Sequence, residues 1–124
     1  MSPSSPLATP LEQTWQVVCN RADLVANSGV VAWLQGRQIA LFYVPQGSDG
    51  EQVFALDNCD PQSGANVIGR GLLGSLNGRR VVASPLYKQH FCLQDGTCLE
   101  SAEQRLQVWP ARIRGDSVEL AGLG

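Results

Sequence analysis

Two stretches of the sequence decide how this chain is interpreted: Asp60-Pro61-Gln62-Ser63-Gly64-Ala65 and Ser84-Pro85-Leu86-Tyr87-Lys88-Gln89-His90-Phe91. Each begins with a small polar residue followed by proline. The first lies inside a segment from Asp57 to Leu76 that has no clear hydrophobic period, and a loop of that length in a compact domain is usually functional. The second follows a run of strand-forming residues. Both are therefore predicted to be functional loops.

Short apolar segments rich in Val, Ile and aromatic residues surround the two loops and are separated by turn signals, which predicts antiparallel strands. The predicted strands run from Trp15 to Cys19, Val30 to Gln35, Gln38 to Val44, Gln52 to Leu56, Arg80 to Ala83, His90 to Leu93, Thr97 to Leu99, Leu106 to Arg114 and Ser117 to Leu120. The first hairpin turn is expected at Gly36-Arg37. Since so many strands must close or stack to hide their edges, an all-β sandwich or barrel is predicted.

Composition excludes several classes of protein. A chain of 124 residues with 44% hydrophobic residues can build one hydrophobic core. Its net charge of −2 leaves no excess of basic residues to bind the phosphates of a nucleic acid. No apolar run approaches the roughly 20 residues of a membrane span. The Ser- and Pro-rich start is not a secretory signal, so residues 1–12 are expected to be a disordered tail, residues 13–124 the domain, and the location cytoplasmic.

The four cysteines, Cys19, Cys59, Cys92 and Cys98, are expected to be reduced and partly buried. A zinc site is not expected, because no C-x2-C spacing exists and the chain has one histidine. If the turn at Asp95-Gly96 has an even number of residues, the thiols of Cys92 and Cys98 point to opposite faces of the sheet; a three-residue loop would pair them. A two-residue type I′ turn is favoured.

The two loops resemble those of the Rieske family, which read Cys-x-His-x-Gly and Cys-Pro-x-His-Gly-x-x-Phe. The residues kept here are Pro61, Gly64, Ala65, Pro85, Leu86 and Phe91. The ligand positions hold Asp60, Gln62, Ser84 and Tyr87. A Rieske cluster needs two thiolates and two imidazoles, and this chain has a single histidine, so such a cluster is excluded by count. The inter-loop disulfide of respiratory Rieske proteins would fall at Ala65 and Leu86, so it is missing too.

A closer resemblance is to the small subunit of assimilatory NAD(P)H-dependent nitrite reductase. That family runs Asp-Pro-x-Ser-Gly-Ala-Asn-Val through the first loop, as residues 60–67 do, and Ala-Ser-Pro-Leu-Tyr-Lys-Gln-His-Phe through the second, as residues 83–91 do. This chain departs from that family at two positions. Cys59 stands where the family usually has Ile or Val, and Cys92 stands where it usually has Asp. The resemblance implies a Rieske-like fold from about Trp15 to Leu120, in which a two-loop subdomain without a cluster sits on a β base.

The resemblance further implies a non-catalytic small subunit with no catalytic residue, cofactor or metal of its own. FAD, sirohaem and an iron–sulfur cluster would then belong to a large partner subunit that reduces nitrite to ammonium. Because Rieske domains present their histidine ligands to the redox partner, Gln62, Ser63, Leu86 and Lys88 are predicted to touch that subunit. Tyr87 either joins this surface or fills the cluster's place with its hydroxyl paired to Asp60 or Ser84.

Other candidate sites receive structural interpretations. His90 is interpreted as a surface strand residue, because no nucleophile motif surrounds it. Asp57 and Asp60 could form a carboxylate pair, but Asp57 and Asn58 are expected to cap turns instead, and Asp60 is expected to accept hydrogen bonds from loop amides. Gly69-Arg70-Gly71 lacks the strand–loop–helix context of a phosphate site and is expected to form tight turns.

Two rival functions remain. One is a thiol-active, redox-sensing β domain that uses Cys59 and Cys92, and the other is a stand-alone ligand-binding barrel. Slow alkylation of the native thiols would count against the first, and a well-behaved monomer that needs no partner would favour the second.

Overall fold

Three antiparallel sheets make up the part of the chain that the computed structural model describes, residues 14–47, 50–86 and 88–122. The all-β fold class predicted from the sequence is confirmed. The expected disordered tail, residues 1–12, lies outside the described residues. Within those residues, no helix is long and apolar enough to cross a bilayer.

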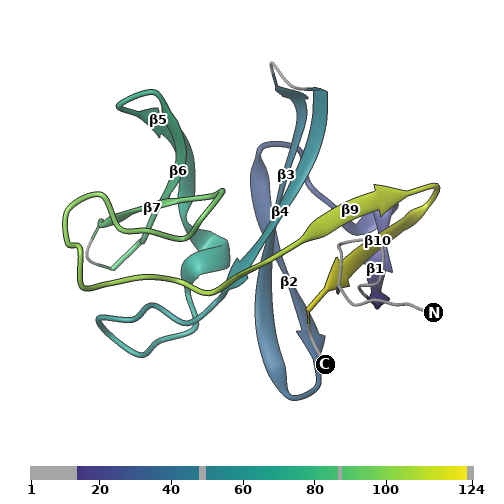
Figure 1. Cartoon of the computed structure of the whole chain (residues 1–124), viewed down its shortest axis with the longest axis horizontal. Coiled ribbons are helices and arrows are strands. Elements are labelled where there is room, and N and C mark those ends of the chain that lie inside the picture. Colours follow the sequence, from purple (N-terminus) through teal and green to yellow (C-terminus); the bar gives the residue numbers. More distant parts are fainter. Residues whose placement is uncertain (1–13, 48–49, 87, 123–124) are drawn as a thin grey trace, which may run out of the picture.

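The sheets stand side by side in Figure 1. The base contains β1 (Trp15–Asn20), β10 (Ser117–Ala121) and β9 (Ala111–Arg114), in that order. The central sheet has the order β2 (Ser28–Leu34), β3 (Arg37–Gly47), β4 (Gly50–Asp57) and β8 (Val108–Trp109). The small sheet consists of β5 (Leu72–Leu76), β6 (Arg79–Ala83) and β7 (His90–Cys92). The 3-10 turns η3 (Arg21–Asp23) and η4 (Ile68–Arg70) complete the described elements.

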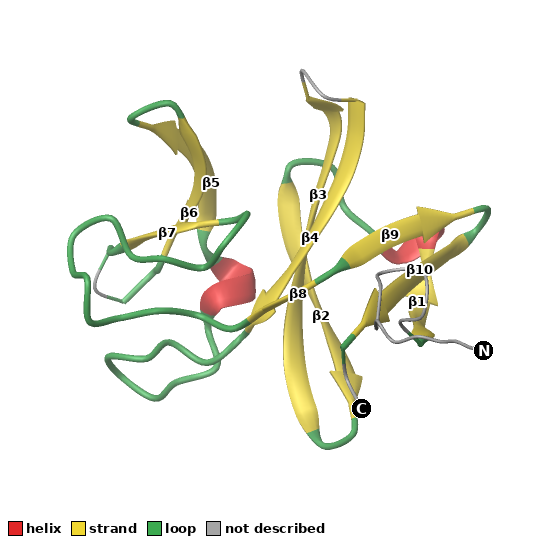
Figure 2. Cartoon of the chain, viewed as in Figure 1, coloured by secondary structure: helices red, strands yellow, loops and turns green. Residues whose placement is uncertain are grey.

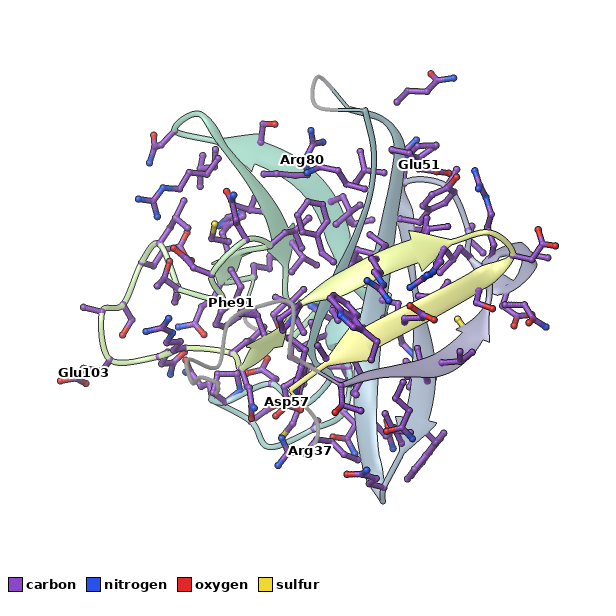
Figure 3. All side chains as sticks on the ribbon, turned by 45° about the vertical axis from the view of Figure 1, so that its right-hand side comes forward. Arg37, Glu51, Asp57, Arg80, Phe91 and Glu103 are labelled. Carbon is purple, nitrogen blue, oxygen red and sulfur yellow. The ribbon has the colours of Figure 1, made fainter. Side chains whose placement is uncertain are left out.

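Alternation along β3 places apolar side chains on both faces of the central sheet. Ile39 and Leu41 point to a cluster shared with Val118 and Leu120 of the base. Ala40 and Phe42 point the opposite way, into a second cluster that contains Ile68 of η4, Val82 and Phe91. Phe91 of this cluster is labelled in Figure 3, which draws the described side chains on the ribbon. The central sheet is therefore covered on both sides, which explains its nearly continuous apolar sequence.

Some predicted elements need correction. The first hairpin turns at Gln35 and Gly36 rather than at Gly36-Arg37, because both residues have positive φ and Leu34 pairs with Arg37. The predicted strand from Leu106 to Arg114 is two strands separated by Pro110, which has no N–H to donate. Val108 pairs with β4, whereas Ile113 pairs with β10. The chain thus passes from the central sheet to the base at this proline.

Two further elements differ near the loops. β5 was not predicted, because its Gly74 and Ser75 dilute the apolar pattern, yet it pairs with β6 along its whole length. After β7 the connection has four residues, since the amide of Cys92 donates to the carbonyl of Thr97 at 2.8 Å. The predicted two-residue turn is wrong, but the even count is right. Thr97 and Cys98 form isolated β-bridges, so the predicted strand from Thr97 to Leu99 is not a named strand.

Candidate functional site

The first loop leaves β4 through two side chains that hold its backbone. The Asp57 carboxylate accepts the amide of Cys59 at 3.0 Å, which is the expected capped turn. Buried Asn58 accepts the amide of Gly69 at 2.6 Å through Oδ1 and donates to Gln38 Oε1 at 2.9 Å through Nδ2. Asn58 therefore fastens both η4 and β3 to the start of the loop, which is a larger role than the cap predicted for it.

Asp60 holds the rest of the first loop together. Its amide donates to the carbonyl of Ala65 at 2.8 Å, and its carbonyl accepts the amide of Gly64 at 2.7 Å. The carboxylate oxygen Oδ1 accepts the amide of Gln62 at 2.8 Å and that of Ser63 at 3.4 Å. Acceptance of loop amides by Asp60 was predicted and is confirmed. Asp57 and Asp60 both accept backbone amides, as the structural interpretation predicted.

Asp60 and Ser84 join the two loops directly. Both side chains are buried, and the Ser84 hydroxyl donates to Asp60 Oδ2 at 2.5 Å. The contact spans 24 positions of sequence and joins the first residues of the two loop motifs. A charge-assisted hydrogen bond of this kind is among the stronger polar contacts in proteins. We call this pair the loop clasp.

The second loop is closed by its own backbone. The amide of Ser84 donates to the carbonyl of Gln89 at 2.8 Å, and the amide of Lys88 donates to the carbonyl of Ser84 at 2.9 Å. Lys88 has φ of 58°, a conformation that L residues adopt only where the surrounding structure requires it. Leu86 and Lys88 are exposed. Tyr87 lies outside the described residues, so both interpretations of its side chain, at the contact surface or in the cluster's place, stay predictions.

The tip of the first loop reaches the long segment after β7. Gln62 and Ser63 are exposed, and Gln62 Oε1 accepts a hydrogen bond from Gln104 Nε2 at 3.1 Å. Gln104 also lines a pocket of about 590 Å³, together with Arg79, Thr97 and Arg105. Figure 2 shows the long green loops gathered beside η4, away from the base. The four residues predicted to touch a partner are thus all exposed on loops.

The donor set of these loops does not fit a Rieske cluster. Asp60, Gln62 and Ser84 offer oxygen and amide atoms in place of thiolates and imidazoles, and the loop clasp already uses two of these side chains. Across the described residues, no group of three or more His, Cys, Asp or Glu side chains is arranged to hold a metal ion. No chemistry through an iron–sulfur cluster can be derived from these atoms.

The cysteines are free thiols. Cys98 pairs with Phe91 in an antiparallel β-bridge, and Cys92 lies one position after Phe91. Cys92 and Cys98 therefore face opposite sides of the sheet, as predicted for a turn with an even number of residues. Burial raises the pKa of the Cys59 thiol, and the charges of Asp57 and Asp60 raise it further. A raised pKa leaves little reactive thiolate, which does not favour the thiol-active alternative.

His90 has a partner that the sequence did not reveal. Its Nδ1 lies 2.6 Å from Glu100 Oε2, and its amide donates to Glu100 Oε1 at 2.8 Å. Burial alone would raise the pKa of Glu100, but these contacts outweigh it and hold the pKa below its ordinary value. His90 is partly exposed and its ring contacts the Glu100 carboxylate, which agrees with its interpretation as a strand residue at the surface.

Comparisons with known proteins agree with this geometry. Residues 14–121 match the Rieske-like [2Fe-2S] domain family. The NADH nitrite reductase small subunit of Salmonella typhimurium is 42% identical over 87% of this chain and 97% of its own. A solved NADH-dependent nitrite reductase small subunit from Mycobacterium tuberculosis superposes with a TM-score of 0.79 at 38% identity, covering 90% of this chain and 97% of that one.

One relative has a different organisation. The nitrite reductase [NAD(P)H] large subunit of Klebsiella oxytoca is 43% identical over 104 residues, which are 84% of this chain but only 10% of that protein. The same domain is therefore found as a small separate chain and as a minor part of a much longer one.

Proposed function

This chain belongs to the Rieske-like domain family and, within it, to the small subunits of nitrite reductase, and on that premise we propose that it serves its enzyme by docking to the large subunit. It has no catalytic residue of its own in this proposal. The reaction it supports is the NAD(P)H-dependent reduction of nitrite to ammonium in the cytoplasm. FAD, sirohaem and an iron–sulfur cluster are carried by the large subunit.

The loop clasp is the observation that carries this proposal. A Rieske domain uses the ends of its two loops to hold a cluster, whereas here Ser84 and Asp60 hold the loops to each other. Two ordered loops therefore keep their exposed tips after losing the ligands. Ordering loops has an entropic cost, so loops that are maintained without chemistry of their own are expected to serve recognition.

The proposed contact surface is the tip formed by Gln62, Ser63, Leu86 and Lys88. Its character suits a partner, because Leu86 is exposed and Lys88 adds one cation. Gln104 steadies Gln62 from the side, so the tip is held before a partner arrives. Preorganisation of this kind lowers the entropic cost of binding.

Co-purification tests the proposal directly. The full chain would be tagged in its own cells, and the eluate examined for a large subunit and for the absorption of sirohaem and flavin. Nitrite-dependent oxidation of the nicotinamide would then be measured with and without this chain. Capture of the coloured subunit by the tagged chain is expected. A tagged chain that elutes alone, with nitrite reduction unaffected by its removal, would contradict the proposed function.

A further inference from the structure

We propose that the pocket lined by Arg79 and Arg105 receives a carboxylate side chain of the large subunit. We call it the arginine pocket. The inference rests on the proposed function and deepens it, because it names the chemistry that the partner must present beside the loop tip. Neither arginine is one of the four residues of that tip, so the pocket can be tested separately.

The arginine pocket lies between the start of β6 and the segment that follows β7. Arg79 begins β6 directly after the turn at Asn77 and Gly78, and Arg105 belongs to the facing segment. Both arginines are exposed. The described lining of this pocket contains no Asp or Glu, so its only formal charges are positive. A guanidinium group matches a carboxylate in both charge and geometry, since two N–H groups can donate to its two oxygens.

The acidic residues of the neighbouring sequence do not fill the arginine pocket. The Asp95 carboxylate accepts the amide of Thr97 at 3.0 Å and its hydroxyl at 2.7 Å. Glu103 is not part of the lining, and Figure 3 shows it at the outer margin of the molecule. The ion pairs found among the described residues involve neither Arg79 nor Arg105. Both guanidinium groups can therefore bind an incoming anion.

The loop that carries Arg105 is closed at its base. Thr97 pairs with Arg105 in an antiparallel β-bridge, and the amide of Leu106 donates to the carbonyl of Gly96 at 2.9 Å. A Cβ on Gly96 would collide with the Leu106 carbonyl, and its φ is 79°, so only glycine permits this closure. The backbone of Arg105 is thus held in place before a partner binds, which lowers the entropic cost of binding.

Gln104 connects the arginine pocket to the loop tip and indicates a polypeptide occupant. Its Nε2 donates to Gln62 Oε1 at 3.1 Å, whereas its own Oε1 is buried and has no hydrogen-bond partner among the described residues. Leaving a buried acceptor unpaired is costly, so an occupant that donates a hydrogen bond there is favoured. A polypeptide offers N–H groups beside its carboxylates, whereas a simple oxyanion such as nitrite has no proton to donate at neutral pH.

The exposure of both arginines also favours a docked partner over a free ion. Contacts between exposed charges are weak and are screened by salt, so these residues would hold an isolated anion poorly. A carboxylate on a subunit already held at Gln62 is presented at a high effective concentration, and the same weak contact then adds to the affinity. The large subunit is therefore the occupant that fits the charge and the position of the pocket.

Binding of the full chain to immobilised large subunit tests the inference. Interferometry at low and high salt would compare the double variants Arg79→Gln/Arg105→Gln and Arg70→Gln/Arg114→Gln. The second is the matched control, because it removes the same charge from two exposed arginines that do not line the pocket. We expect Kd at low salt to rise about tenfold for the pocket variant and to stay within about twofold for the control. The difference should shrink at high salt, and thermal unfolding should show that both variants fold.

A cross-linking variant identifies the occupant while keeping the positive charge. Arg105→Lys places an amine in the arginine pocket, and a carbodiimide joins an amine to a carboxylate in direct contact, with loss of water. Mass spectrometry of the treated complex should find the peptide that contains position 105 joined to an Asp or Glu of the large subunit. Arg114→Lys, the control at an exposed position of β9, should give no such product.

The outcomes separate this inference from the proposed function. If the wild-type chain binds, then equal affinity of the two double variants, or no cross-link at position 105, overturns the arginine pocket while the docking function stands. If the wild-type chain does not bind, the proposed function fails and the inference fails with it. If nitrite alone binds the isolated chain in calorimetric titration and Arg79→Gln/Arg105→Gln abolishes that binding, the occupant is a free anion and the proposal is overturned.

Discussion

The hydroxyl of Ser84 donates to the carboxylate of Asp60 across two loops that lie 24 positions apart in the sequence, and both side chains are shielded from water. Each residue begins its loop motif, and by resemblance to the Rieske motifs each falls on the first ligand position of its loop. The contact connects the two loops through one hydrogen bond between their side chains.

Removing the hydroxyl from the loop clasp should destabilise the domain. Ser84→Ala leaves Asp60 Oδ2 buried without its partner, so the free energy of unfolding should fall by about 1–3 kcal/mol. Urea titration followed by tryptophan fluorescence measures it. Ser75→Ala, at an exposed position of β5, is the control and should change stability by less than about 0.5 kcal/mol. Equal stability of the two variants would show that the clasp contributes nothing.

The purified chain should be colourless. The ligand positions of the described loops carry oxygen and amide groups, two of which bond to each other, and the chain has one histidine. Iron and acid-labile sulfide should therefore be far below one cluster per chain after anaerobic purification. Stoichiometric iron with Rieske-type absorption would refute this expectation.

Reversing the charge at the loop tip should slow association. Lys88→Glu is expected to lower the rate of binding to the large subunit several-fold at low salt, and the effect should shrink as ionic strength rises. Stability should be unchanged, because Lys88 is exposed and glutamate meets the same backbone conformation. Interferometry at two salt concentrations makes the measurement, with Lys88→Gln separating loss of charge from reversal. Wild-type rates for both variants at low salt would remove Lys88 from the interface.

Stability at acid pH should depend on Glu100. Its pKa is lower in the folded chain than the ordinary 4.5, so folding favours the ionised form. The resulting stabilisation is complete above pH 4.5 and is lost as the pH falls through the folded-state value. Glu100→Gln should therefore flatten the loss of melting temperature below about pH 4.5. Parallel acid profiles for the variant and the wild type would show that the contact with His90 does not contribute.

Patterns that act over a few residues were readable from the sequence. The apolar run of residues 38–44 and the alternation of residues 52–56 located β3 and β4. The side-chain chemistry of Asp57 and Asp60 indicated their bonds to nearby amides. The fold class followed from the number of strands. The second loop followed from Ser84-Pro85 after a run of strand-forming residues, whereas the first was predicted too long, because β5 at its end was missed.

Contacts between distant segments were not readable in the same way. Glu100 lies in an irregular segment, and nothing local marks it as the partner of His90. Gln104 meets Gln62 over 42 positions, and Asn58 reaches Gln38 over 20. These pairs depend on how the loops pack on η4. The hydrophobic pattern of the sequence does not predict that packing. β5 was not predicted for a related reason. Its pairing with β6, and not its own composition, makes it a strand.

The loop clasp also changes what the cell must supply to make this domain. A fold pinned by a serine and an aspartate is complete as soon as the chain itself has folded. A chain that purifies colourless, as expected above, would need no iron, no sulfide and no assembly machinery, and would offer oxygen nothing to oxidise at the loop clasp. Such a subunit can be synthesised in advance and wait in its final shape, while only its partner depends on the delivery of metal.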